Sequence, residues 1–310
     1  MTATDHGQGS ISAVIVGLLL TAICATPLVL HFTQKRHDQL HVALLEAQPE
    51  GQSPPNGEAF ATTVIAIIDH ELSGGSGWRP NDFFLWGHRL MADNNAHRQL
   101  GIIQALRESV RVFKDHLTKV SATEYDANLV AAETAFRNDA ERFWFPSAES
   151  KFREAAEGIE RYIEGLRATP PKSKPINRRN VELIRLFQVW TDLLGDAHAN
   201  LFKTRETDGS AVPIWRTDDY FYHAQGFAHV MVHLIVAVKR EYEVDFVNRP
   251  SVVEVIDEVA DALGRAATLK PLMVLDGSAS GLFANHRRNL DGYIVEARQK
   301  MYSIREELEK

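Results

Sequence analysis

Hydrophobic residues first gather in one uninterrupted run near the start of the chain. The segment from Ile11 to Phe32 contains no Asp, Glu, Lys or Arg, and its single histidine is His31. A bilayer core of about 30 Å needs about 20 apolar residues in a helix, and such a helix satisfies its own backbone hydrogen bonds in lipid. The run therefore predicts a transmembrane anchor within residues 1–33, in contact with a lipid bilayer.

A cleaved signal peptide and a lipid-modified cysteine are alternative interpretations of this run. Small residues at 22–25 resemble a cleavage site, but signal peptides have apolar cores of about 7–15 residues after a basic start. Here the run continues past Pro27, and no Lys or Arg precedes it. Cys24 follows the bulky Ile23, where a lipidation site would have a small residue. An uncleaved anchor explains the pattern better.

The charges beside the run bear on orientation. Lys35 and Arg36 follow it directly, which by the positive-inside rule places the rest of the chain in the cytoplasm. The rule is weak for a long following domain, because such domains translocate largely regardless of charge.

Beyond the anchor, the apolar residues take on a helical period. Residues 34–57 are rich in Pro, Gly and polar side chains, which predicts a stalk and a flexible linker. From residue 58 onward, apolar residues recur at steps of three and four, and no stretch alternates as a strand would. We therefore predict an all-α fold. The expected helices are 60–72, 83–117, 121–143, 147–166, 181–202, 217–242, 250–269 and 285–310.

The helical part divides into two halves that resemble each other. Prolines at 170, 171 and 175 separate residues 58–168 from residues 176–310. The sequence WRPNDFF at 78–84 matches WRTDDYF at 215–221, and FPS at 145–147 matches FAN at 283–285. We predict an internal repeat of two related helical bundles that pack face to face. Coincidence between common capping sequences is the alternative.

The repeated motif has an expected structural role. Its members are Trp78, Arg79, Asp82, Trp215, Arg216 and Asp219. We expect each aspartate to cap a helix, and each tryptophan to fold onto the first turn as in a hydrophobic staple.

Composition limits the functions that the chain can have. The 310 residues carry a formal net charge of -7, which argues against a nucleic-acid partner because such a partner requires a basic face. The only cysteine, Cys24, lies in the predicted anchor. The helical part therefore contains no disulfide, no thiolate nucleophile and no cysteine-ligated metal.

Histidines on one predicted helix are candidate metal ligands. His229 and His233 are four residues apart, a spacing that places both imidazoles on one helix face, and His223 lies upstream. No glutamate follows His229, so the zinc-protease signature is absent and a further ligand would have to come from another helix. The alternative is a pair of partly buried histidines that form ordinary hydrogen bonds, with no cofactor.

A second polar group lies on the predicted helix 83–117. Asp93 and His97 are one turn apart and could share a proton, with His88, Asn94 and Asn95 nearby. No nucleophile can be assigned beside them, so no catalytic residue follows from the sequence alone. The alternative is a solvated or helix-contacting polar face.

Several segments together resemble the domain-of-unknown-function 2333 family of bacterial membrane-anchored proteins. They are residues 78–82, 93–94, 144–147, 217–222 with Gly226, and 283–286. The resemblance covers most of residues 58–308. It implies a single-pass bacterial protein with a periplasmic helical part, whereas the charges after the anchor favour the cytoplasm. It supplies no activity and no cofactor.

The function expected from these features is a non-enzymatic one. We predict a scaffold or accessory subunit at the bacterial inner membrane that binds a protein partner, as a monomer or a homo-oligomer. One alternative is a metal- or cofactor-binding protein that uses His229 and His233. Another is a hydrolase that uses Asp93 and His97.

Overall fold

A computed structural model describes residues 12–22, 25, 29, 40, 56–82, 93–119, 124–271, 273–277 and 282–310. The described residues form helices and loops with no β-strand, apart from two isolated bridges. The all-α prediction is confirmed. We refer to residues 56–310 as the head.

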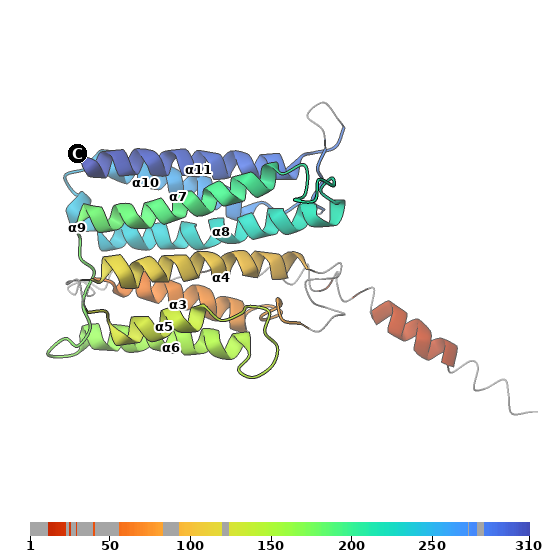
Figure 1. The fold of residues 1–310 in the computed structure, drawn as a ribbon, viewed down its shortest axis with the longest axis horizontal. Coiled ribbons are helices and arrows are strands. Elements are labelled where there is room, and N and C mark those ends of the chain that lie inside the picture. The colour runs from red at the N-terminus through yellow and green to blue at the C-terminus, as the bar shows by residue number, and fades with distance from the viewer. Residues whose placement is uncertain are drawn as a thin grey trace, which may run out of the picture.

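The head contains two successive sets of helices (Figure 1). The first set comprises α3 (Glu58–Ser73), α4 (Asn94–Val112, continued by a π-turn at Phe113–Leu117), α5 (Ala127–Phe136) and α6 (Ala148–Arg167). The second set comprises α7 (Asn180–Phe202), α8 (Ile214–Glu241), the short α9 (Glu243–Phe246), α10 (Pro250–Thr268) and α11 (His286–Glu309).

The last helix of each set packs against two earlier helices of its own set. Helix α6 packs against α3 and α5, and in the same way α11 packs against α7 and α10. The most extensive contact in the head joins α4 to α8, one helix from each set. One continuous hydrophobic core extends through both sets. The two sets therefore share an interior and meet at the α4–α8 seam.

Two glycines allow the backbones of α4 and α8 to touch. A Cβ atom on Gly101 would lie 2.1 Å from the carbonyl oxygen of His223, and one on Gly226 would lie 2.2 Å from that of Arg98. His223 lies three residues before Gly226, and Arg98 lies three residues before Gly101. The two contacts are therefore equivalent, and the crossing is locally symmetric. Any side chain at either position would force the helices apart.

A buried polar network lies beside this crossing. Arg98 donates to Glu71 of α3 at 3.0 Å, and Gln99 donates to the other carboxylate oxygen of Glu71 at 3.0 Å. The side chains of Arg98 and Glu71 are 4% and 1% exposed. A desolvated ion pair therefore fixes α4 to α3 beside the seam.

Helix starts agree with the sequence at some positions and differ at others. Ser147 and Asn285 cap α6 and α11, as predicted, by accepting backbone N–H bonds. The helix expected at 121–143 is shorter than predicted, because α5 ends at Phe136. Asp126 caps α5, and residue 121 lies outside the described residues. Helix α10 has no side-chain cap, and the hydroxyl of Ser251 donates to Glu307.

The predicted anchor is described only in part. Ser12–Ala22 forms an apolar helix with exposed side chains, which stands apart from the head in Figure 1. Most of residues 23–55, and therefore the rest of the predicted anchor and the linker, lies outside the described residues. Among the described helices, Trp215–Glu241 is long and apolar enough to cross a membrane, but 78% of its most apolar stretch is buried inside the head. It is a core helix.

The repeated motif predicted from the sequence has different surroundings in the two sets. Trp78 is buried in a loop, where its indole N–H donates to the carbonyl of Ala140. Trp215 lies in the first turn of α8 and is 72% exposed. The hydrophobic staple expected for Trp215 is therefore wrong, and the helix start on which Trp78 is expected to fold lies outside the described residues.

Candidate functional site

The candidate site lies where α4 and α8 begin. Asp93 precedes the first residue of α4, and His97 lies one turn inside it. Asp219 lies in the second turn of α8, which begins at Ile214 after Pro213. The prediction that Asp219 caps this helix is wrong, because the helix starts five residues earlier. Asp219 instead turns toward α4.

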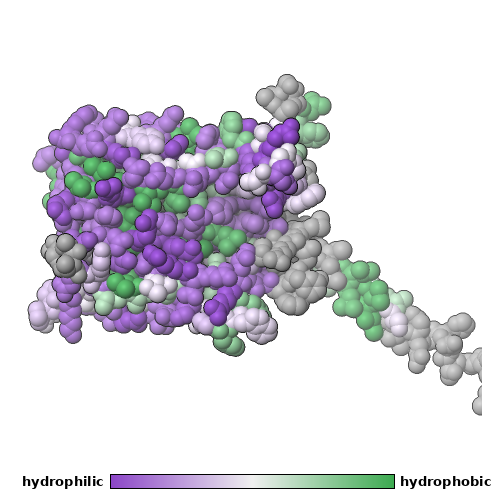
Figure 2. Space-filling model, in the orientation of Figure 1, coloured by the Kyte–Doolittle hydropathy of each residue, from purple (hydrophilic) through white to green (hydrophobic). Residues whose placement is uncertain are grey.

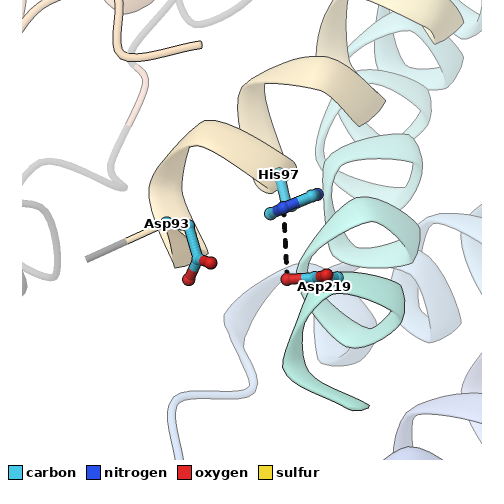
Figure 3. Close-up of side chains that lie close together, drawn as sticks. All are labelled: Asp93, His97 and Asp219. Atoms are coloured by element: carbon cyan, nitrogen blue, oxygen red, sulfur yellow. Dashed lines mark ion pairs between the residues drawn. The ribbon is translucent and has the colours of Figure 1, made fainter. Parts of the chain in front are cut away.

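Three side chains from the two helices converge at this point (Figure 3). The Nε2 atom of His97 lies 3.1 Å from an oxygen of Asp219. Asp93 joins them, so that one ligand-capable atom from each residue lies within 4.8 Å of the others. In the part of the chain that the structure describes, this is the one group of three His, Cys, Asp or Glu side chains close enough to hold a metal ion.

Negative charge accumulates at the site. Burial and the nearby carboxylates of Asp219 and Asp218 raise the pKa of Asp93 to about 7. Burial and Asp219 also raise the pKa of Asp218. One carboxylate oxygen of Asp218 is buried and has no hydrogen-bond partner. Three aspartates are thus held together at partly buried positions where a positive charge would be favourable.

A cavity of about 330 Å³ opens beside His97 and Asp219. Its lining residues are His97, Ala197, Asn200, Arg216, Asp219, Tyr220, His223 and Ala224. This lining of described residues contains no Ser, Thr or Cys that could act as a nucleophile. The arrangement can bind a cation or transfer a proton between imidazole and carboxylate. Arg216, in the lining, pairs with Glu206 at 3.4 Å.

The histidines predicted as metal ligands have different surroundings. The rings of His229 and His233 lie 4.9 Å apart on α8, as their spacing predicts. Burial and the nearby Arg98 lower the pKa of His229 well below its usual value, and burial and the nearby His70 lower the pKa of His233 to about 4. Neutral imidazoles can bind metals, but a positive environment disfavours a further cation. Metal binding by this pair stays a prediction.

His223, the third predicted ligand, lies in the cavity of the candidate site. Burial and the nearby His97 lower its pKa to about 4, so its ring is neutral at physiological pH. The remaining motif residues, Arg79 and Asp82, form an ion pair with each other, and Asp82 caps none of the described helices. His88 lies outside the described residues.

Spacing along the chain pairs Asp93 with His97 but leaves Asp219 out. A second alignment of the halves contains the missing signal. Asp218 and Gly226 follow Asp93 and Gly101 at one distance along the chain, 125 residues. The glycines meet at the seam, and α4 and α8 begin at the same end of the head (Figure 1), so the residues near the two aspartates lie at one end of the seam.

Comparisons with known proteins agree with this architecture. No curated protein and no solved structure matched the chain. A family model matched residues 5–201 and again residues 176–310, and the two matches overlap across most of α7. Because these matches cover nearly the whole chain, the protein belongs to DUF2333, a family described as uncharacterized proteins conserved in bacteria.

Proposed function

We propose that this protein is a membrane-tethered metal-binding protein, whose head binds one divalent transition-metal ion between α4 and α8. Asp93, His97 and Asp219 would be the ligands. Asp218, directly before Asp219 on α8, would contribute negative charge near the ion. This proposal replaces the histidine pair of α8 with a site shared between the two halves.

The observation that carries the proposal is the convergence of the three ligand atoms from two helices. Two ligands about 2.0–2.1 Å from a tetrahedral ion lie roughly 3.3 Å apart, which is close to the 3.1 Å between His97 and Asp219. Asp93 must move inward from within 4.8 Å. A side-chain rotation at the start of a helix is sufficient for such a movement.

The electrostatics of the site favour a cation and suggest its class. A carboxyl with a pKa of about 7 takes up a proton because its surroundings disfavour another negative charge. A divalent ion would replace that proton. Imidazole with two carboxylates suits Mn²⁺, Fe²⁺ or Zn²⁺, whereas Mg²⁺ and Ca²⁺ prefer oxygen ligands alone.

The tether is proposed from the N-terminal apolar run. Its described part, Ser12–Ala22, exposes Val14, Leu18 and Leu20 to solvent. Exposed aliphatic side chains along a helix that does not pack on the head fit insertion into lipid. The bacterial inner membrane, with the head in the periplasm, is the location that the family resemblance implies. A scaffold role for a protein partner, expected from the sequence, stays a prediction.

Isothermal titration of the full chain in mild detergent tests the metal site. After treatment with a chelator, Zn²⁺ or Mn²⁺ should bind at one ion per chain, and Mg²⁺ should bind at least about tenfold more weakly. The variants His97→Ala and Asp219→Asn should each lose about 10–100-fold in affinity. Because Asp93 must give up its proton, affinity should rise from pH 6 to pH 8.

The matched control is another histidine–aspartate pair in the head. His198 of α7 lies 2.7 Å from Asp291 of α11, and no third ligand joins this pair among the described residues. His198→Ala should leave the affinity unchanged. Equal losses in His198→Ala and His97→Ala would show adventitious binding and would reject the site.

A further inference from the structure

We propose that the head docks onto the bilayer surface through the end at which α4, α6, α8 and α11 begin. Aromatic side chains from separate loops would insert at the level of the lipid headgroups. The inference rests on the membrane tether of the proposed function, and it does not depend on the metal site. We call this end of the head the aromatic end.

Exposed Phe and Trp side chains are concentrated at this end. Every Phe and Trp that is exposed among the described residues belongs to it; these residues are Phe143, Trp144, Phe145, Phe202, Trp215 and Phe283. Phe145 is 93% exposed, and Leu282, beside Phe283, is fully exposed. Elsewhere on the described head, Tyr125 and Tyr302 are exposed, and the residues at and beside α9 expose the aliphatic Val244 and Val247. Single exposed apolar residues are normal, but a collection of one type at one end indicates a contact surface.

Four of the six exposed rings belong to two loops with firmly bonded bases, whereas Phe202 ends α7 and Trp215 lies in the first turn of α8. The loop before α6 is held by Trp78, which donates to the carbonyl of Ala140, and by Asn81, which donates to the carbonyl of Arg142. These bonds fix the base while the rings of Trp144 and Phe145 point outward.

The loop before α11 is built in a comparable way. Asn285 donates to the carbonyl of Gly277 at 2.6 Å, and Arg287 donates to Asp276 at 3.0 Å. Figure 2 shows apolar groups at this end, one above and one below the middle of the head. Two supported loops therefore present aromatic side chains on either side of the seam.

The bilayer is the occupant that the chain itself indicates. Trp and Tyr are enriched at the boundary between lipid and water, and Trp and Phe form the buried face of helices that lie in this boundary. The apolar helix Ser12–Ala22 belongs to the same chain and lies off the aromatic end in Figure 1. Because the tether keeps the head near the membrane, it raises the effective concentration of the head there. Weak insertion of the aromatic side chains is then sufficient for docking.

The point where the chain enters the head is compatible with this orientation. Helix α3 begins at Glu58 at the end opposite the aromatic rings. Residues 33–55 can span up to about 75 Å, whereas α8, the longest helix with 28 residues, is about 42 Å long. Leu40, within that segment, packs against the core of the head. The linker is long enough to run from the bilayer along the whole head.

Site-specific labelling of the full chain in vesicles tests the docking. In a Cys24→Ser background, Phe145→Cys, Phe283→Cys and the control Val247→Cys would each carry a polarity-sensitive fluorophore. Vesicles of phosphatidylcholine and phosphatidylglycerol with brominated acyl chains quench labels that enter the membrane. We expect blue-shifted emission and a loss of roughly half the intensity at 145 and 283, and no loss at 247.

Flotation of the same vesicles separates docking from tethering. A chain that floats while the labels at 145 and 283 stay unquenched overturns the docking alone. Blue-shifted labels without quenching point to a protein partner or a second copy, and also overturn it. A chain that does not float overturns both the docking and the tether, while metal titration tests the site between α4 and α8 independently.

Discussion

Helices α4 and α8 meet twice, and the two meeting points differ in character. In the middle of the seam, Gly101 and Gly226 bring the backbones into contact within a dry core. At the start of the same helices, Asp93, His97 and Asp219 face one another beside a solvent cavity. The first contact leaves no space and tolerates no change. The second keeps charged groups close together without filling the space between them, which is the condition that a ligand site requires.

The largest expected effect comes from removing the charge beside the glycine crossing. Arg98→Met leaves the carboxylate of Glu71 buried without its cation, and should lower the free energy of unfolding by about 3–5 kcal/mol. Chemical unfolding of the full chain in mild detergent measures the loss. The double variant Glu71→Gln with Arg98→Met should recover much of it. A single variant as stable as the parent would contradict a desolvated pair.

Closing the space between the helices should have the next largest effect. Gly226→Ala places a Cβ atom 2.2 Å from the carbonyl oxygen of Arg98, and should lower the free energy of unfolding by about 2–3 kcal/mol. Gly292→Ala is the control, because a Cβ atom there meets nothing within 4 Å. In the middle of α11 it should stabilise the protein by about 0.5–1 kcal/mol. The same glycine-to-alanine substitution would then lower the free energy of unfolding at one position and raise it at the other.

The polar end of the seam should show a smaller effect that depends on pH. The pKa of Asp93 rises from 3.8 to about 7 in the folded state, so the folded protein holds a proton that the unfolded chain has released. Stability without metal should therefore fall as the pH rises from about 4 through 7, by about 1–2 kcal/mol after solvent screening. Thermal unfolding with a chelator measures this slope.

The variant Asp93→Asn removes the titrating group and should flatten the pH dependence. At pH 8 it should unfold at a higher temperature than the parent without metal, because one of three neighbouring negative charges is gone. With saturating Zn²⁺ the order should reverse. An identical slope in Asp93→Asn would assign the pH dependence to another group.

Sequence patterns predicted most of the helices, because each helix carries its own signal, but the helix expected at 121–143 ends at Phe136. Apolar spacing and local capping groups placed the start of α6 after Ser147 and that of α11 after Asn285. They failed where a residue has two possible roles. Asp219 follows a plausible capping sequence, and nothing nearby shows that its helix begins at Ile214.

The candidate site could be only half predicted for a related reason. Asp93 and His97 lie one turn apart, so the sequence itself connects them. Their contact with Asp219 depends on how α4 packs against α8, and helical periodicity does not specify the partner of a helix. The matching glycines at 101 and 226 specify it, but a glycine inside a helical pattern can equally mark a bend, a helix end or a close contact with any neighbour.

The carboxylate of Glu241, near the last turn of α8, accepts the backbone N–H groups of Gly57 at 2.7 Å and Phe60 at 3.1 Å. These groups lie where the chain enters the head, and Glu58 beside them pairs with Arg167 of α6. A mechanical pull on the linker would therefore reach the longest helix directly, instead of peeling α3 away turn by turn. Tension on the linker would then be shared among α3, α6 and α8, because all three helices are bonded at this joint.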